Sequence, residues 1–405
     1  PGRSYGCVPG AEFQEVAMTS VKDAQEFLAR SEVDAWLIYD YKGINPTLAR
    51  VTGPLADMTR PCFYLIPGQG DPTFLAHYVD AGRVEASGLK PRVFYSRDGM
   101  IRELETLLSG VETVAMEYSP KGELPRVSKV DAGTVELVRG FGCEVVSSGD
   151  LAQYVTMRWS QDQLHSHQRA SARVGKIVHQ AFEFIDKGLA SGVDEYQVRE
   201  YIRQRFTEEG LATDAGPTVA IDEHCSDPHY QPTASDSSAI KMGDWVLIDL
   251  WAREPGDSGV YADICWVAYA GARVPKEHQR VFDAVIQARD LAFEGLHRAL
   301  EDGVAMKGWQ VDRIARDHIE KAGYGEAFGH RLGHSLGAQV HDDGVNLDDL
   351  ETHDTRTVIP GVGLTIEPGV YLKHFGVRSE INFYVEEKGL LMTSPLQQQV
   401  VLIGG

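Results

Sequence analysis

The segment Trp245-Val246-Leu247-Ile248-Asp249-Leu250-Trp251 places a single carboxylate in the middle of an apolar run. Such a run is typical of a buried β-strand. A second run, Tyr261-Ala262-Asp263-Ile264-Cys265-Trp266, repeats the arrangement after a Pro- and Gly-containing loop of hairpin length. A hairpin could bring both carboxylates to one face of a sheet. Judged alone, each Asp favours an exposed strand end or turn instead, so its role depends on the rest of the chain.

Two later acids repeat the pattern. Glu367 ends the apolar run 364–366 before a Pro-Gly turn, and Glu380 precedes Ile381-Asn382-Phe383. Burying one ionised carboxylate without a partner costs several kcal/mol, so four converging carboxylates require counter-charge. The sequence supplies little positive charge near them, whereas two divalent cations balance four carboxylates. The neutral imidazole of His334 completes an oxygen-rich ligand set that suits Mn, Fe(II), Co or Zn. A dinuclear metal site is therefore predicted.

The histidines are a second indication of a site. His334 and His341 lie in the segment 329–341, where three glycines favour a loop that approaches a ligand closely. His229 lies in a turn-like Asp-Pro-His-Tyr element before the first Asp strand. A lone histidine is more often a satisfied surface or core residue than a catalytic one. The same interpretation applies to His77, His224, His353 and His374.

The wider pattern predicts two domains. Residues 20–150 alternate short apolar runs with amphipathic ones, which indicates an α/β domain. Strands are predicted there at 35–39, 63–66, 72–76, 113–116 and 144–146, and helices at 21–31 and 130–139. Residues 147–150 break the pattern, and a bridge over 151–160 follows. Beyond it we expect helices at 161–187, 194–209 with Asp194 as N-cap, 276–300 and 311–321, and strands at 244–251, 260–270, 363–366 and 381–386.

Composition limits the function classes. The 405 residues carry 39 Lys and Arg against 59 Asp and Glu, a formal charge of −20, which disfavours nucleic-acid and anionic-membrane partners. No run reaches the ~18 uninterrupted apolar residues of a membrane helix, and Pro1-Gly2-Arg3-Ser4 lacks a signal-peptide pattern. The cysteines are odd in number and lack CxxC spacing, which favours reduced thiols in a cytoplasmic protein. They are Cys7, Cys62, Cys143, Cys225 and Cys265.

In chain order, the motifs resemble the signature of the pita-bread metallopeptidases, which include methionine aminopeptidase, aminopeptidase P, prolidase and the related creatinase. The motifs are Pro228-His229-Tyr230, Asp249, Asp263, Gly333-His334-Ser335, His341, Glu367-Pro368-Gly369 and Arg378-Ser379-Glu380. The α/β half resembles the creatinase-type N-terminal domain of prolidase and aminopeptidase P. The resemblance implies an α/β creatinase-like domain over residues 1–155 and an α+β pita-bread catalytic domain over residues 156–405.

The resemblance also implies a role for each site residue. Asp249 is expected to chelate one metal, Asp263 and Glu380 to bridge the pair, and His334 and Glu367 to bind the other, with a hydroxide between the metals. Glu367 is the expected proton acceptor, and His341 and His229 are expected to hydrogen-bond the substrate and the oxyanion. Arg378 is expected to orient Glu380 or to meet a substrate carboxylate. Manganese is the expected metal, with zinc, cobalt or iron as alternatives, and a homodimer is the expected assembly.

Several residues depart from the family pattern. Trp251 replaces a small residue two positions after the first Asp, and the indole is expected to narrow the pocket. Ser335 and Arg331 replace glycines beside His334 and His330, and Asp342 replaces a Glu. The acid-rich stretch 342–356 stands where prolidase-like relatives grip a substrate carboxylate. Arg356 and His353 are expected to lie in a solvated loop there.

Cleavage of the X-Pro bond of dipeptides or short peptides is the leading hypothesis. One alternative is hydrolysis of another C–N bond in a small nitrogenous compound, as in creatinase, which itself lacks the metal ligands. A second is a metal-dependent lyase of the dimethylsulfoniopropionate lyase type. A third is a binding module, as in histone chaperones of this fold, whose members have typically lost the ligands that this chain retains.

Overall fold

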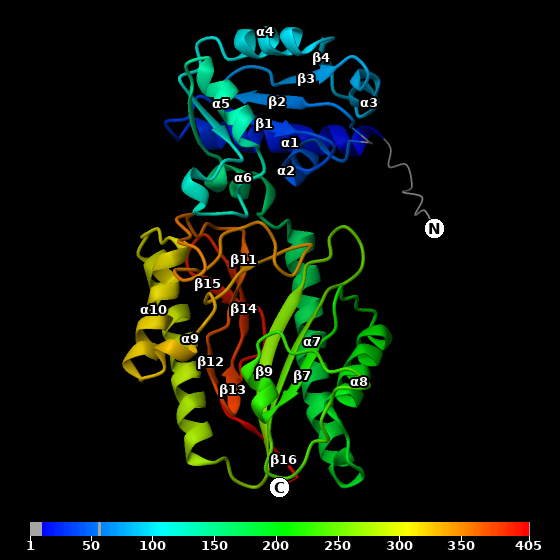
Figure 1. Ribbon diagram of the computed structural model, residues 1–405, viewed down its shortest axis with the longest axis vertical. Helices are drawn as coiled ribbons and strands as arrows, with labels where there is room; N and C mark the ends of the chain where they lie inside the picture. The colour runs from blue at the N-terminus through cyan, green and yellow to red at the C-terminus, as the bar shows by residue number, and fades with distance from the viewer. Residues whose placement is uncertain (1–9, 56–57, 405) are drawn as a thin grey trace. The chain divides into compact units, whose positions relative to one another are not determined.

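The computed structural model describes residues 10–55 and 58–404, with side chains from residue 18 onward. Cys7 and the first four residues, on which two expectations rested, lie outside the described residues. The chain divides into two compact units, Pro1–Met157 and Arg158–Gly405 (Figure 1).

The N-terminal unit is built on a six-stranded mixed sheet of order β4-β3-β2-β1-β5-β6. Its strands are β1 (Ala35–Asp40), β2 (Cys62–Pro67), β3 (Thr73–His77), β4 (Pro91–Phe94), β5 (Thr113–Met116) and β6 (Glu144–Ser147). Its helices are α1 (Gly10–Leu28), α2 (Pro46–Thr52), α3 (Ala81–Ala86), α4 (Arg97–Leu107), α5 (Ala132–Gly140) and α6 (Gly149–Thr156). Every residue of β1 is buried, as expected of a central strand with both faces covered. The predicted α/β pattern is confirmed.

One expectation for this unit is wrong. Helix α6 begins at Gly149, where the sequence predicted a break, and it fills most of the expected bridge. The Ser148 hydroxyl does not cap the helix, because it donates instead to the buried carboxylate of Glu117 at 3.0 Å. Because the Ser148 hydroxyl bonds a residue 31 positions away, the local sequence does not indicate that a helix starts here.

The C-terminal unit holds two four-stranded sheets and a two-stranded ribbon between two helix pairs (Figure 1). One sheet has the order β16-β9-β8-β7, with β7 (Thr218–Ile221), β8 (Trp245–Ala252), β9 (Ala262–Ala270) and β16 (Val401–Ile403). The other has the order β10-β11-β14-β15, with β10 (Ser335–Leu336), β11 (Gly363–Ile366), β14 (Ile381–Val385) and β15 (Leu390–Met392). The ribbon pairs β12 (Gly369–Leu372) with β13 (Phe375–Arg378). The helices are α7 (Gln161–Gly188), α8 (Glu195–Glu208), α9 (Lys276–Glu301) and α10 (Gly308–Lys321).

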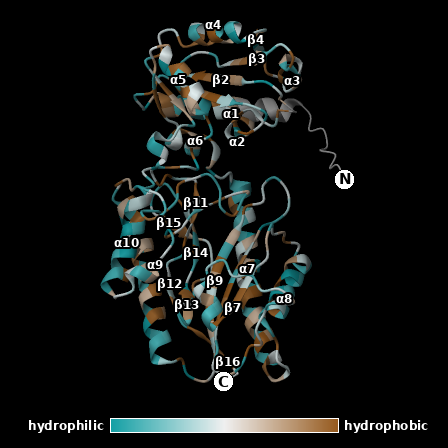
Figure 2. Cartoon of the chain, in the orientation of Figure 1, coloured by the Kyte–Doolittle hydropathy of each residue, from teal (hydrophilic) through white to brown (hydrophobic). Residues whose placement is uncertain are grey.

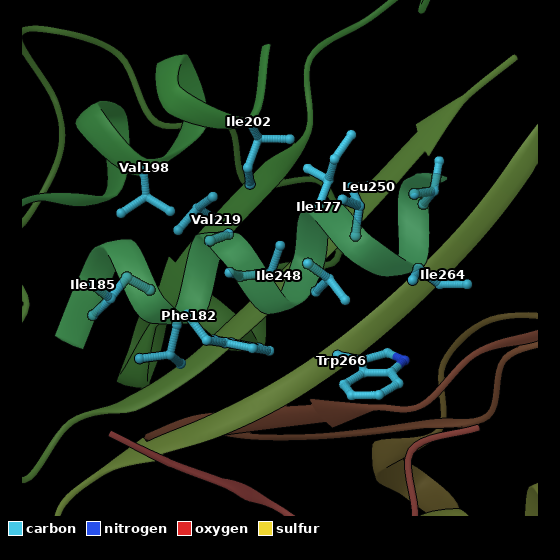
Figure 3. Close-up of a cluster of buried hydrophobic side chains, with 14 of the residues drawn as sticks. Ile177, Phe182, Ile185, Val198, Ile202, Val219, Ile248, Leu250, Ile264 and Trp266 are labelled. Atoms are coloured by element: carbon cyan, nitrogen blue, oxygen red, sulfur yellow. The ribbon is translucent and has the colours of Figure 1, made fainter. Parts of the chain in front are cut away.

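Helices α7 and α8 begin where their caps predict. The side chains of Ser160 and Asp194 each accept from the backbone N–H three residues on, and Gln163 and Gln197 complete two capping boxes. The helices pack their apolar sides on strands β7 to β9, and Figure 3 shows Phe182 and Ile185 of α7 beside Val198 and Ile202 of α8. Each such side chain contributes roughly 1.5–3 kcal/mol when fully buried. Residues of both β8 and β9 belong to this core, which therefore supports the hairpin.

The hydropathy of the residues differs between the strands and the outer helices. Figure 2 shows hydrophobic colour on the strands and hydrophilic colour on much of α10. Among the described residues, no helix is both long and apolar enough to cross a membrane. Cys62, Cys143, Cys225 and Cys265 are buried free thiols, as expected.

Candidate metal centre

The β8–β9 hairpin presents both of its acids on one face. In its antiparallel register, Trp251 lies opposite Asp263 and Asp249 lies opposite Cys265. Opposed residues, and residues two apart along a strand, share a face, so Asp249, Trp251 and Asp263 project from the same side. The exposed fraction is 14% for the Asp249 side chain and 7% for the Asp263 side chain. The predicted hairpin is confirmed, and an exposed strand-end position is excluded for both acids.

Glu367 and Glu380 are tied to the hairpin and to the histidine loop by backbone hydrogen bonds. The Glu367 N–H, directly after β11, donates to the Leu332 carbonyl at 2.7 Å. The Glu380 N–H, between β13 and β14, donates to the Cys265 carbonyl at 3.2 Å. In addition, the Asn382 side chain of β14 accepts from the Asp263 N–H at 2.9 Å. These bonds bring acids from distant parts of the chain onto the β9 face.

His334 is buried and its ring is oriented by backbone contacts. The backbone N–H of His334 donates to the Thr365 hydroxyl at 3.0 Å, and the ring Nδ1 lies 3.2 Å from the Ser335 carbonyl. Because a carbonyl only accepts, Nδ1 carries the proton and Nε2 is left with its lone pair. Nε2 lies 3.3 Å from Glu367 Oε1 and 3.7 Å from Asp263 Oδ2. The ring therefore presents a metal-ligand nitrogen to two carboxylates.

The donor set fits divalent cations. Three carboxylate oxygens, one each from Asp249, Asp263 and Glu380, are buried without a hydrogen-bond partner among the described residues. Ligand atoms of Asp263, His334 and Glu380 all lie within 4.8 Å of one another. Each unsatisfied charged oxygen costs more than about 1–3 kcal/mol, unless a cation takes the place of the missing donors.

The electrostatics of the cluster lead to the same conclusion. Burial raises the pKa of Asp263 and Glu380 well above the usual range, and the neighbouring acids raise both further. Burial raises the pKa of Glu367 to about 7, although the charges of Arg378 and Arg331 oppose the rise. Positive charge placed among these groups favours their ionised forms. The protein alone thus disfavours the charge state that metal ligation requires.

Arg378 is the positive charge of the acid cluster. Its guanidinium is buried and pairs with Asp249, and no described hydrogen bond joins it to Glu380. It also donates to the Tyr371 hydroxyl at 2.9 Å, and that oxygen lies 2.8 Å from Nε2 of His330. His330 Nδ1 lies 2.6 Å from the Arg331 carbonyl, so Nδ1 donates and Nε2 accepts from Tyr371. The guanidinium thus supplies Asp249 with buried positive charge that the sequence did not reveal, and its charge also opposes the rise that burial causes in the pKa of Glu380. The expectation that Arg378 orients Glu380 or meets a substrate carboxylate stays a prediction.

The two other predicted histidines differ in placement. The His341 ring packs edge-on against His334 with a centroid distance of 4.2 Å and is exposed on its outer side. The His229 ring is exposed, and among the described residues it makes no hydrogen bond, ion pair or ring contact. Its loop nevertheless runs beside Asp249, because Gln231 donates to the Thr218 hydroxyl at 2.8 Å and Thr218 lies opposite Asp249 in the β7–β8 register. The structure brings His341 to the acid cluster and leaves the His229 ring in solvent.

Helix α10 and an internal salt bridge hold the histidine loop. Arg316 donates to the carbonyls of Phe328 and His330, and Asp312 accepts both from Arg316 and from the Leu332 N–H at 3.0 Å. The glycines do mark a loop, as predicted. Arg356, expected in solvent, is 3% exposed and bonded to Asp354. Mutual neutralisation lets this pair lie inside an acid-rich stretch that looked solvated. His353 is half exposed.

Three residues of the site were not predicted from the sequence: Thr365, Tyr371 and Asn382. Thr365 accepts from His334 and donates toward Glu367 at 3.4 Å. Its place two residues before Glu367, on the alternating face of a strand, was a usable signal. Tyr371 and Asn382 contact His330 and Asp263, which lie 41 and 119 residues away in the chain, so local sequence offers no signal for these contacts.

Comparisons with known proteins agree with this geometry. The profile of metallopeptidase family M24 matches residues 166–387. An uncharacterized peptidase of Staphylococcus epidermidis is 30% identical over 236 residues, which cover 57% of this chain and 60% of that protein. The match therefore spans about three fifths of that relative's length.

Solved structures overlay nearly the whole chain. The dipeptidase PepE from Mycobacterium ulcerans superposes with a TM-score of 0.70 at 22% identity, covering 98% of this chain and 100% of that one. The prolidase from Pyrococcus horikoshii OT3 superposes with a TM-score of 0.60 at 24% identity, covering 94% and 99%. At these identities the overlays show the fold alone. They confirm the expected class, an α/β N-terminal domain followed by an α+β domain of pita-bread fold.

Proposed function

Because this chain belongs to metallopeptidase family M24, we propose that it is a hydrolase that holds two divalent metal ions and cleaves the X-Pro bond of dipeptides or short peptides. The main support is that Asp249, Asp263 and Glu380 each bury a carboxylate oxygen without a described partner, and that ligand atoms of Asp263, Glu380 and His334 lie within 4.8 Å of one another. Such oxygens have no role in stability, but they are what a metal site requires.

We assign the ligands as follows. Asp249 would hold one metal, Asp263 and Glu380 would touch both, and His334 and Glu367 would hold the other. Manganese is the proposed metal, and zinc, cobalt or iron would fit the same donors. When bound, such a pair supplies a water activated at neutral pH and polarises the scissile carbonyl.

Glu367 and the side chains around the ligands are assigned the proton transfer, the contacts with substrate and the positioning of Asp249. Glu367 is the proposed proton acceptor, because 15% of its side chain is exposed whereas Asp263 and Glu380 are more enclosed. His341 would hydrogen-bond the substrate from its place against His334. His229 would do so from the loop beside Asp249, after a movement of its ring from solvent. Arg378 would hold Asp249 in place and keep it ionised.

The proline preference rests on the overlays, since the prolidase from Pyrococcus horikoshii OT3 carries that activity in its name. A homodimer is the proposed assembly, which light scattering would test. The four buried free thiols support a reducing compartment, and we propose the cytoplasm.

The test is a cleavage assay on chelated protein reconstituted with manganese. The panel contains X-Pro dipeptides, longer X-Pro peptides and X-Ala dipeptides, and an Asp263→Asn variant is the control. We expect metal-dependent release of the N-terminal residue from X-Pro substrates and none from the variant. Activity on dipeptides alone would make the enzyme a dipeptidase. Two bound metals without cleavage of any X-Pro substrate would overturn the proline assignment, and elimination products would indicate a lyase.

A further inference from the structure

Trp251 stands inside the site. It lies directly opposite Asp263 in the β8–β9 register and two residues after Asp249 on the same face. Its indole packs against a cluster that includes Leu336 and Val340, which neighbour His334 and His341 in sequence. A bulky side chain therefore borders the acid cluster on the side of the two histidines.

Asp214 is held beside this indole. Its segment is bridged to the end of β8 by two backbone hydrogen bonds, because Ala212 and Arg253 each donate to the other's carbonyl at 2.9 Å. The Trp251 Nε1–H then donates to Asp214 Oδ1 at 3.2 Å. Asp214 is exposed, and no cation pairs with it among the described residues. Its charge nevertheless acts on the buried Asp263.

An exposed carboxylate with a free oxygen beside a hydrolytic site is suited to binding an ammonium group. We propose that Asp214 and Trp251 form the subsite for the amino-terminal residue of the substrate: Asp214 binds the free α-ammonium, and the indole limits the size of the side chain. This assignment rests on the function proposed above. It makes the enzyme an exopeptidase for substrates with a free amino terminus and a small first residue.

The Asp214→Asn variant tests the ammonium contact. The substrates are Ala-Pro and N-acetyl-Ala-Pro at pH 7, where the α-amine is mostly protonated. We expect the variant to raise KM for Ala-Pro about 10-fold to 100-fold with kcat nearly unchanged, because one charge-assisted hydrogen bond is lost. The matched control is Asp302→Asn, which removes the same charge from an exposed position after α9. An unchanged KM, or an equal loss for the acetylated peptide, would overturn the assignment of Asp214.

Two substitutions of Trp251 separate its two tasks. Trp251→Ala should raise kcat/KM for Phe-Pro relative to Ala-Pro at least about 10-fold, because the indole no longer fills the space. Trp251→Phe keeps most of the bulk but removes the N–H that holds Asp214, so it should weaken amine selectivity and keep size selectivity. Loss of both selectivities in the Phe variant would show that the ring acts only as general packing.

Binding without cleavage distinguishes this subsite from the proposed function. Calorimetry on the metal-free protein should show tighter binding of Ala-Pro than of its acetylated form, and Asp214→Asn should reduce the difference at least fivefold, although the cluster carboxylates also attract an ammonium. If that holds while the metal-loaded enzyme cleaves no X-Pro substrate, the subsite stands and the proposed function fails. If the enzyme cleaves X-Pro dipeptides while Asp214→Asn changes neither binding nor KM, the subsite fails alone.

Discussion

Both units of the molecule bury a carboxylate, and they do so in opposite ways. In the N-terminal unit, Glu117 is 2% exposed and accepts from Trp36 Nε1 at 2.7 Å, Asn45 Nδ2 at 2.8 Å and the Ser148 hydroxyl. In the C-terminal unit, Glu380 is equally buried, but its Oε1 has no described partner. Burial raises the pKa of both groups.

Neither burial nor a raised pKa therefore identifies the functional acid. The distinction lies in whether each oxygen has a donor. The fold supplies hydrogen-bond donors to both carboxylate oxygens of Glu117, which therefore acts as a structural link between strands and helices. Glu380 and Asp263 each keep one carboxylate oxygen without a described donor, as expected of residues that bind a cation.

Activity should give the largest contrast. Replacing Glu380 with Gln in the metal-loaded enzyme should lower kcat/KM about 1000-fold or more, because several kcal/mol of transition-state stabilisation depend on the metals. Glu117→Gln should leave kcat/KM within about threefold at a temperature where the variant is folded. Glu117 and its partners lie in the N-terminal unit, whereas the acid cluster lies in the C-terminal unit. Comparable losses in the two variants would remove the distinction.

Stability of the metal-free protein should change with opposite sign. Glu117→Gln should lower the free energy of unfolding by about 1–3 kcal/mol, because an NH2 group then faces donors. Glu380→Gln should leave it unchanged or raise it, because one of several repelling buried charges is removed. Urea unfolding at pH 8 with a chelator measures both, and a destabilised Glu380→Gln protein would contradict the account of an incomplete cluster.

The pH dependence should sharpen the contrast. A carboxyl group whose pKa is raised on folding stabilises the native state at low pH and loses that contribution as pH rises. The pKa of Glu367 is about 7, and those of Asp263 and Glu380 are also raised. The melting temperature of the metal-free protein should therefore fall as pH rises toward and above 7, and saturating Mn should flatten the curve.

The effect of histidine titration on stability can be separated from the effect of these carboxylates. The buried His167 and the partly buried His330 have pKa values lowered by desolvation to about 4 and about 3, so they destabilise the fold only as pH falls below about 6.5. Thermal scans between pH 6.5 and 8 avoid most of that window and span the titration of Glu367, whose pKa is about 7. A flat metal-free profile over this range would contradict the raised pKa of Glu367.

The smallest effect on activity is expected from the hydroxyl of Tyr371, whose hydrogen bonds are all made within the protein. Tyr371→Phe removes a hydroxyl that joins Arg378 to His330 and leaves the ligands intact. A lost hydrogen bond of about 1 kcal/mol should lower kcat/KM about fivefold, without loss of bound metal measured by mass spectrometry. Loss of a metal would show that the hydroxyl, and not only the guanidinium, keeps Asp249 in position.

The sequence predicted the parts of the fold and the cluster that depend on local pattern. Asp249 and Asp263 each interrupt an apolar run, and Glu367 ends one, so strand period and burial indicate them directly. The pairing of Arg378 with Asp249 was not predictable, because it joins positions 129 residues apart and depends on the folded register. Arg356 looked solvated for a related reason, since only the structure shows that Asp354 neutralises it.

The contacts behind Arg378, the partner of Asp249, also connect the site to a surface helix. Arg316 of α10 donates to the His330 carbonyl at 2.8 Å, and from His330 the hydrogen bonds run through Tyr371 to Arg378. Ordering of the cluster by metal should therefore reduce local opening of α10. Deuterium uptake by the amides of α10 should slow when the metals bind, which offers a way to follow the occupancy of the centre without any substrate.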